Sequence, residues 1–140
     1  MRALVQRVKE ASVSVAGEEA ARIGPGLLVF LGVKVGDGPE QADRIAGKLR
    51  RLRIFEDAEG RMNLSLDDVG GEVLCVSQFT LYGDARKGNR PSFVETAAPQ
   101  QAEPLYERVR DALGARGGLF GARMQVSLVN DGPITILVEA

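Results

Sequence analysis

The chain has 140 residues, of which 44% are hydrophobic and 26% are charged, and these are the proportions of an ordinary globular protein. A single folded domain over residues 1–140 is therefore expected, and a disordered or fibrous chain is excluded. The formal net charge of −1 excludes a general attraction to nucleic acid, so any contact with phosphate must come from a local group of cations.

The first third of the chain combines strand patterns with one helix. Val13 and Val15 alternate with serines as in a half-buried strand, and Leu27–Val33 is an apolar run typical of a strand buried on both faces. A helix is predicted over Pro39–Leu52, because apolar side chains recur there at helical spacing. Its apolar positions are Ala42, Ile45, Ala46, Leu49 and Leu52, and its opposite face carries Arg44, Lys48, Arg50 and Arg51.

A second helix is predicted over Pro99–Leu113, between two groups of strands. Pro104 lies inside this pattern, so the helix is expected to begin effectively there. A short apolar strand over Val73–Val76 precedes the helix, and two alternating strands, 124–128 and 134–138, close the chain. This order predicts an α/β domain whose helices cover one side of the sheet.

No segment has the pattern of a signal peptide or a membrane span. The longest apolar run, Leu27–Leu31, is far too short to cross a bilayer, and the first residues enter a strand pattern at once. Cys75 is the only cysteine and cannot form an internal disulfide, which agrees with a reducing compartment. These features predict a cytoplasmic protein without membrane contact.

The absence of histidine limits the chemistry that the chain can perform. Neither a Ser-His-Asp nor a Cys-His arrangement can be built from it, and one cysteine without imidazole removes most catalytic zinc sites. We therefore expect no metal and no cofactor. The carboxylates that could supply an acid–base pair flank glycine-containing turns, which favours exposed turns instead; they are Glu56, Asp57, Glu59, Asp67 and Asp68.

The first candidate site is Ser77-Gln78-Phe79-Thr80-Leu81, directly after the apolar strand Val73–Val76. Side chains at the exit of a buried strand are held precisely by the scaffold, and functional groups often occupy such positions. The alternative is a strand end whose hydroxyl groups satisfy the local backbone, and the segment alone favours this alternative.

The second candidate is Asn130-Asp131-Gly132-Pro133-Ile134-Thr135, between the two closing strands. Asn, Asp, Gly and Pro are the common turn residues, so the local pattern predicts a hairpin turn. A Gly-Pro bond is one of the few that adopt the cis form at low cost, although the base rate of about 5% predicts trans from sequence alone.

The third candidate is the polar loop 84–93, which contains Arg86, Lys87 and Arg90. Such a loop could bind a phosphate backbone, and the cationic face of the predicted helix, with Arg44, Lys48, Arg50 and Arg51, could extend the patch. The alternative is that its charges are only solvated, as is usual for charge-rich loops.

Together these segments resemble the bacterial D-aminoacyl-tRNA deacylases. That family carries a Ser-Gln-x-Thr-Leu motif and an Asn-x-Gly-Pro-x-Thr motif, which stand here at residues 77–81 and 130–135 in the family's order and separation. The segments 2–8, 51–57, 62–63 and 89–93 also look like the family, so the resemblance spans the chain. A sibling branch that acts on L-alanyl-tRNA has Pro-Gln-Ala-Thr-Leu in the first motif, and Ser77 with Phe79 places this sequence outside that branch.

The resemblance implies a fold, an oligomeric state and an activity. The expected fold has mixed, largely antiparallel β-sheets in a barrel-like core with two helices packed on one side. The expected activity is hydrolysis of the ester bond of D-aminoacyl-tRNA, releasing amino acid and tRNA, and also of glycyl-tRNA mischarged on tRNA(Ala). The protein is expected to be a homodimer, with its sites at the subunit interface.

The resemblance also assigns roles to residues. Gly132-Pro133, with a cis peptide bond, enters the pocket of the partner subunit and excludes L-amino acids, and Arg7 helps to hold this motif. The 3′-terminal aminoacyl-adenosine lies near the first motif, where Thr80 has a structural or positioning role because no histidine can deprotonate it. The candidate catalytic residues are Ser77, Gln78, Phe79 and Thr80, and the candidate substrate-binding residues are Asn130, Gly132, Pro133, Ile134, Thr135 and Arg7.

Two other hypotheses remain open. A non-catalytic tRNA-binding module would use the cations of loop 84–93, bind tRNA with salt-dependent affinity and hydrolyse nothing. A structural oligomer would use Gly132-Pro133 only as a turn.

Overall fold

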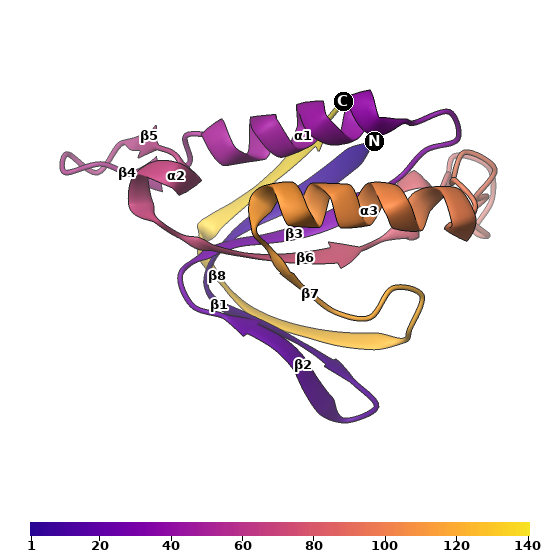
Figure 1. The fold of residues 1–140 in the computed structure, drawn as a ribbon, viewed down its shortest axis with the longest axis horizontal. Coiled ribbons are helices and arrows are strands. Elements are labelled where there is room, and N and C mark those ends of the chain that lie inside the picture. Colours follow the sequence, from indigo (N-terminus) through magenta and orange to yellow (C-terminus); the bar gives the residue numbers. More distant parts are fainter.

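The main sheet of the protein is built around one long strand, β1 (Figure 1). In the computed structural model, which describes residues 1–140, the elements in chain order are β1 (Arg2–Val15), β2 (Glu18–Ile23), β3 (Gly26–Gly32), α1 (Pro39–Arg51), β4 (Phe55–Glu56), β5 (Met62–Leu64), α2 (Leu66–Val69), β6 (Glu72–Ser77), the 3-10 helix η1 (Phe79–Tyr82), α3 (Pro99–Leu113), β7 (Arg116–Gly117) and β8 (Met124–Glu139).

Strand β1 pairs on both of its edges. On one edge its first half is antiparallel to β3 and its second half is antiparallel to β2, and on the other edge β8 runs antiparallel along nearly its whole length. The parallel pairs β3–β6 and β6–β7 extend the sheet, whereas β4 and β5 form a separate small sheet. The long strands curve, and the sheet approaches a barrel (Figure 1).

Helices α1 and α3 lie next to each other on one side of the sheet (Figure 1). Each helix buries its apolar stripe against the sheet, as the helical spacing predicts. Between the helices, Arg108 donates two hydrogen bonds to the Asp43 carboxylate, at 2.7 and 3.0 Å. This arrangement confirms the predicted mixed, largely antiparallel α/β fold with two long helices on one side. No helix is long and apolar enough to span a membrane.

Strand β3 is apolar throughout because both of its faces are covered. Leu27 and Val29 belong to the larger core beneath the helices, and Leu28 between them belongs to a smaller core on the opposite face of the sheet. All three side chains are fully buried. The unbroken apolar run Leu27–Val33 is therefore explained by a strand that lies between two apolar layers.

Two expectations about the elements were wrong. Helix α3 begins at Pro99 and continues through Pro104, because burial of its apolar face outweighs the one backbone hydrogen bond that a proline removes near the helix start. Residues 130–135 are not a hairpin turn, and the two predicted closing strands are one strand, β8. Both halves of β8 pair with the same neighbour, β1, so the chain does not reverse between them.

Candidate functional site

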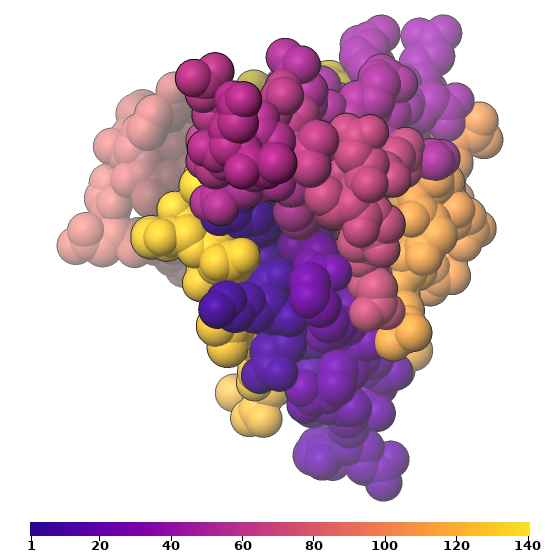
Figure 2. Space-filling model, turned by 90° about the vertical axis from the view of Figure 1, so that its left-hand side faces the viewer, coloured from indigo at the N-terminus to yellow at the C-terminus, as the bar shows by residue number.

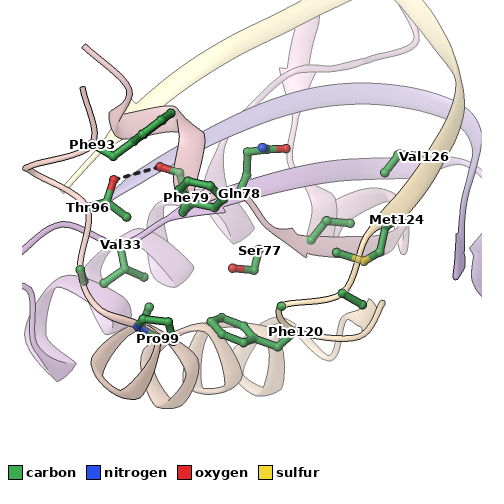
Figure 3. A pocket seen from close by; sticks show the side chains of 15 residues that line it. Val33, Ser77, Gln78, Phe79, Phe93, Thr96, Pro99, Phe120, Met124 and Val126 are labelled. Atoms are coloured by element: carbon green, nitrogen blue, oxygen red, sulfur yellow. Dashed lines mark hydrogen bonds between the residues drawn. The ribbon is translucent and has the colours of Figure 1, made fainter. Parts of the chain in front are cut away.

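A largely apolar pocket of about 620 Å³ opens at the end of strand β6 (Figure 3). Its wall combines the exit of β6, the start of η1, the start of α3 and the start of β8. None of its side chains is titratable. The lining residues are Val33, Val76, Ser77, Gln78, Phe79, Phe93, Thr96, Ala97, Pro99, Ala102, Phe120, Gly121, Ala122, Met124 and Val126.

Three residues of the first motif lie in this pocket. Ser77 is the last residue of β6, and the next N–H, that of Gln78, donates to the Leu31 carbonyl at 2.8 Å, which continues the pairing with β3. The Phe79 ring meets the Phe93 ring edge-on, with 5.3 Å between centroids. The Thr96 hydroxyl donates to the Phe79 carbonyl at 3.3 Å (Figure 3). The sheet therefore fixes the backbone at Ser77 and Gln78, and the loop after η1 packs against the Phe79 ring.

Thr80, the fourth residue of the motif, does not line the pocket. Its side chain is exposed, and its hydroxyl accepts a hydrogen bond from the Gln78 side chain. No carboxylate lines the pocket either, so no side chain there could remove a proton from a threonine hydroxyl. The pocket can position a neutral ligand between aromatic rings and polar groups, but it contains no side-chain base.

The second motif forms a bulge in β8. On β1, Arg7 alone separates the partners of Asn130 and Thr135, whereas residues 131–134 separate these two residues on β8. The Asn130 side chain closes the bulge, because its amide accepts from the Ile134 N–H at 2.8 Å and donates to the Ile134 carbonyl at 3.0 Å. This four-residue bulge stands where the local pattern predicts a turn.

The peptide bond between Gly132 and Pro133 is cis, and both residues are exposed at the top of the bulge. Gly132 has a φ of +151°, and a Cβ atom there would lie 2.6 Å from the N atom and the Cγ1 atom of Ile134. Only glycine fits this backbone without a shift of the neighbouring chain.

Arg7 fastens the bulge from β1. Its side chain is buried, and it donates to the Asp131 carbonyl at 2.9 Å and to the Ile54 carbonyl at 2.7 Å. The carboxylates of Asp131 and Glu56 lie 3.8 and 3.9 Å from its guanidinium group. Arginine suits this position, because its planar guanidinium group can donate to two carbonyls in different segments.

The two motifs do not meet within one chain. None of the residues 130–135 lines the pocket, and neither does Arg7. The structure also brings together no three carboxylate or thiolate side chains in a position to hold a metal ion.

Sequence patterns missed most of the pocket wall. Thr96, Phe120 and Met124 stand in no motif that points to a site, whereas Phe93 ends the candidate loop 84–93, which was singled out for its cations. Two further contacts of the bulge were also missed. The Gln6 side chain donates to the Thr135 hydroxyl at 3.1 Å. The Ile54 carbonyl accepts a hydrogen bond from Arg7, and no sequence pattern reveals a contact made by a main-chain atom.

Comparison with known proteins agrees with these observations. The family model described as D-Tyr-tRNA(Tyr) deacylase matches residues 4–139. The D-aminoacyl-tRNA deacylase of Desulfatibacillum aliphaticivorans is 58% identical, with 100% of this chain and 99% of the relative covered. The protein of the same name from Myxococcus xanthus is 55% identical, with 100% of this chain and 95% of the relative covered.

A solved structure described as c-Myc DNA Unwinding Element Binding Protein is also similar. It is 42% identical and superimposes with a TM-score of 0.93, over 100% of this chain and 99% of that chain. With the family model covering nearly all residues and relatives above half identity, the chain belongs to the D-Tyr-tRNA(Tyr) deacylase family.

Proposed function

We propose that this protein hydrolyses the ester bond of D-aminoacyl-tRNA and releases the free amino acid and the tRNA. The deacylase activity follows from membership of the family, whose curated relatives carry that name. The observation that carries the finer proposal is a pocket with the Ser-Gln-Phe motif and no titratable side chain. We infer that the 3′-terminal aminoacyl-adenosine binds there, positioned by Ser77, Gln78 and Phe79.

The chemistry in this pocket needs no side-chain base. An aminoacyl ester is already reactive toward water, and the neighbouring ribose 2′-hydroxyl of the substrate assists its hydrolysis. Phe79 and Thr80 are the first two residues of η1, so their backbone N–H groups have no hydrogen-bond partner within that helix. They are therefore candidates to stabilise the oxyanion that forms at the ester carbon. Orientation and these dipoles supply the catalysis.

Discrimination between D- and L-amino acids requires a wall on one side of the pocket. The two isomers carry identical groups, so attraction to any one group separates them poorly. We propose that Gly132 and Pro133 of the partner subunit form this wall in a homodimer. Two observations support the proposal: the Gly-Pro bulge is exposed and outside its own pocket, and β8 is an edge strand carrying the exposed apolar side chains Val129 and Leu137.

Exclusion by a wall predicts the range of substrates. Glycine has no side chain to exclude, so glycyl-tRNA, including glycine mischarged on tRNA(Ala), is expected to be hydrolysed. We propose that the enzyme acts in the cytoplasm, where aminoacyl-tRNA is made and used.

The decisive experiment compares D-tyrosyl-tRNA, L-tyrosyl-tRNA and glycyl-tRNA as substrates of the purified protein, and measures its molecular mass in solution. Release of D-tyrosine and glycine, with L-tyrosyl-tRNA left largely intact, is expected from a dimer. Equal rates on the D and L esters would contradict exclusion. A monomer with full D-selectivity would contradict a wall supplied by the partner subunit.

The same assay tests the non-catalytic alternative. A relative of known structure is described as a DNA-binding protein, so binding to nucleic acid without hydrolysis is a real alternative for this fold. Salt-dependent binding of tRNA with no release of amino acid would favour it over the deacylase.

A further inference from the structure

The loop between η1 and α3 projects from the body of the molecule beside the pocket. It extends past the start of α3 in Figure 1 and stands apart at the left of Figure 2, in salmon. Asp84 and Ser92 exchange two backbone hydrogen bonds of 2.8 Å and close its base. Gly88, with a φ of +66°, supplies the turn, and residues 85–91 are all exposed. The loop is thus a short projection with a fixed base.

Two of its three cations are free to bind another molecule. Arg86 donates to both carboxylate oxygens of Asp84, at 2.9 and 2.7 Å, and these bonds lower the pKa of that carboxyl to about 2. Arg86 is therefore occupied within the loop. Lys87 and Arg90 are exposed and have no carboxylate within ion-pair distance. The nearby Glu95 is engaged by Lys34 at 3.5 Å.

The base of the loop is joined to the pocket. Phe93 directly follows the closing residue Ser92, lines the pocket and packs on Phe79. The same ring lies against Gly83, where an added Cβ atom would come within 3.0 Å of it. The loop that carries the free cations is therefore anchored at its base, and this base adjoins the pocket wall.

We propose that Lys87 and Arg90 bind the phosphate backbone at the acceptor end of the tRNA whose terminal adenosine occupies the pocket. The inference rests on the proposed function, because it concerns the part of the same substrate that lies outside the pocket. The protein has a net charge of −1 and cannot attract a polyanion as a whole, so local cations must supply the attraction. Phosphate contacts carry no sequence information, so the loop would accept tRNAs of different sequence.

The test removes both charges, Lys87→Gln with Arg90→Gln, and measures hydrolysis of D-tyrosyl-tRNA at 50 and 200 mM salt. Two lost phosphate contacts predict a KM increase at low salt, and a salt-induced rise in KM about tenfold smaller than for the unaltered protein. The rate on 3′-D-tyrosyl-adenosine, which has no phosphate backbone, is expected to match that of the unaltered protein.

A control with the same change of charge is Arg44→Gln with Lys48→Gln on the outer face of α1. Both side chains are exposed and without ion pairs, like Lys87 and Arg90, but they lie on α1, none of whose residues lines the pocket. If the loop alone binds the tRNA backbone, this pair should leave the KM for D-tyrosyl-tRNA and its salt dependence unchanged. Equal effects of the two pairs, or no effect of the loop pair, would overturn the inference. An equal loss on the adenosine ester would also overturn it, because the loop would then act through the pocket.

Failure of the proposed function would look different. The unaltered protein would then release no D-tyrosine from D-tyrosyl-tRNA or from 3′-D-tyrosyl-adenosine. In that case the proposed binding of the tRNA acceptor end by the loop would also be wrong, because it rests on the deacylase activity.

Discussion

Replacement of Arg7 by lysine tests whether the bulge depends on one guanidinium group. Arg7 donates to the carbonyls of Asp131 and Ile54, which belong to different segments of the chain. A lysine keeps the positive charge but has a single ammonium group on a flexible stem, which cannot reproduce the planar fork. Arg7→Lys should therefore keep one of the two contacts and release the other.

The expected cost follows from the geometry. A hydrogen bond from a charged donor contributes about 1.5–3 kcal/mol, and a carbonyl left without a partner in the buried interior costs a similar amount. The carboxylates of Glu56 and Asp131 are largely exposed and lie almost 4 Å away, so those ion pairs add at most about 1 kcal/mol. We expect Arg7→Lys to lower the free energy of unfolding by about 2 kcal/mol.

The same variant should lose selectivity. A bulge released from β1 holds Gly132 and Pro133 less firmly, so the ratio of D-tyrosyl-tRNA to L-tyrosyl-tRNA hydrolysis should fall by up to about 30-fold, the equivalent of 2 kcal/mol. Urea unfolding and the two hydrolysis rates measure these effects. Arg22→Lys, at an exposed pair with Glu19, is a control expected to change neither. Lower stability with unchanged selectivity would refute the role of Arg7 in holding the wall.

Three further predictions concern other parts of the molecule. Thr80→Ala should retain deacylation within about tenfold, because Thr80 lies outside the pocket lining; complete loss in a folded variant would indicate a nucleophile. Gly132→Ala should lose most of its selectivity between D- and L-tyrosyl-tRNA, since the added Cβ atom would clash with Ile134; unchanged selectivity would rule out the wall. Burial raises the pKa of Cys75 and of Tyr106 to about 12. Because the folded protein holds these protons more tightly than the unfolded chain, stability measured in urea should fall as pH rises above about 9, and a constant stability from pH 8 to 11 would contradict it.

The helices and the buried strand could be predicted because their signals are local. The apolar stripe of α1 and the unbroken run of β3 describe which faces are covered, and burial decides both. The start of α3 could not be predicted in this way. Pro104 is a strong local signal against a helix, but the packing of residues farther along the helix outweighs it.

The closing strand shows the limit of local reasoning more clearly. Asn130, Asp131, Gly132 and Pro133 suit a hairpin turn and a bulge equally well, because both need a backbone that leaves the regular strand conformation. Only the neighbouring strand distinguishes the two. Strand β1 is long enough to pair with both halves of β8, so the residues between them rise out of the sheet instead of reversing the chain.

A similar distinction applies to the site. The Ser-Gln-Phe motif was visible because it is contiguous and follows a strand, whereas Phe93 and Phe120 enter the pocket only through the tertiary fold. The missing histidine was informative in a different way, because a chain without imidazole lacks the commonest side-chain base at neutral pH. The pocket lining contains no titratable side chain, and this is why we propose positioning as the means of catalysis.

The separation of the two motifs would also give the proposed chiral filter a physical advantage. A wall must hold its position to within a fraction of an ångström, and the bulge is fixed from beneath by Arg7 and across its base by Asn130, independently of anything bound in its own pocket. The pocket is fixed separately by the sheet and the Phe79–Phe93 contact. In the proposed dimer, the two motifs would meet as surfaces that are each held by contacts of their own chain, so binding would need little rearrangement.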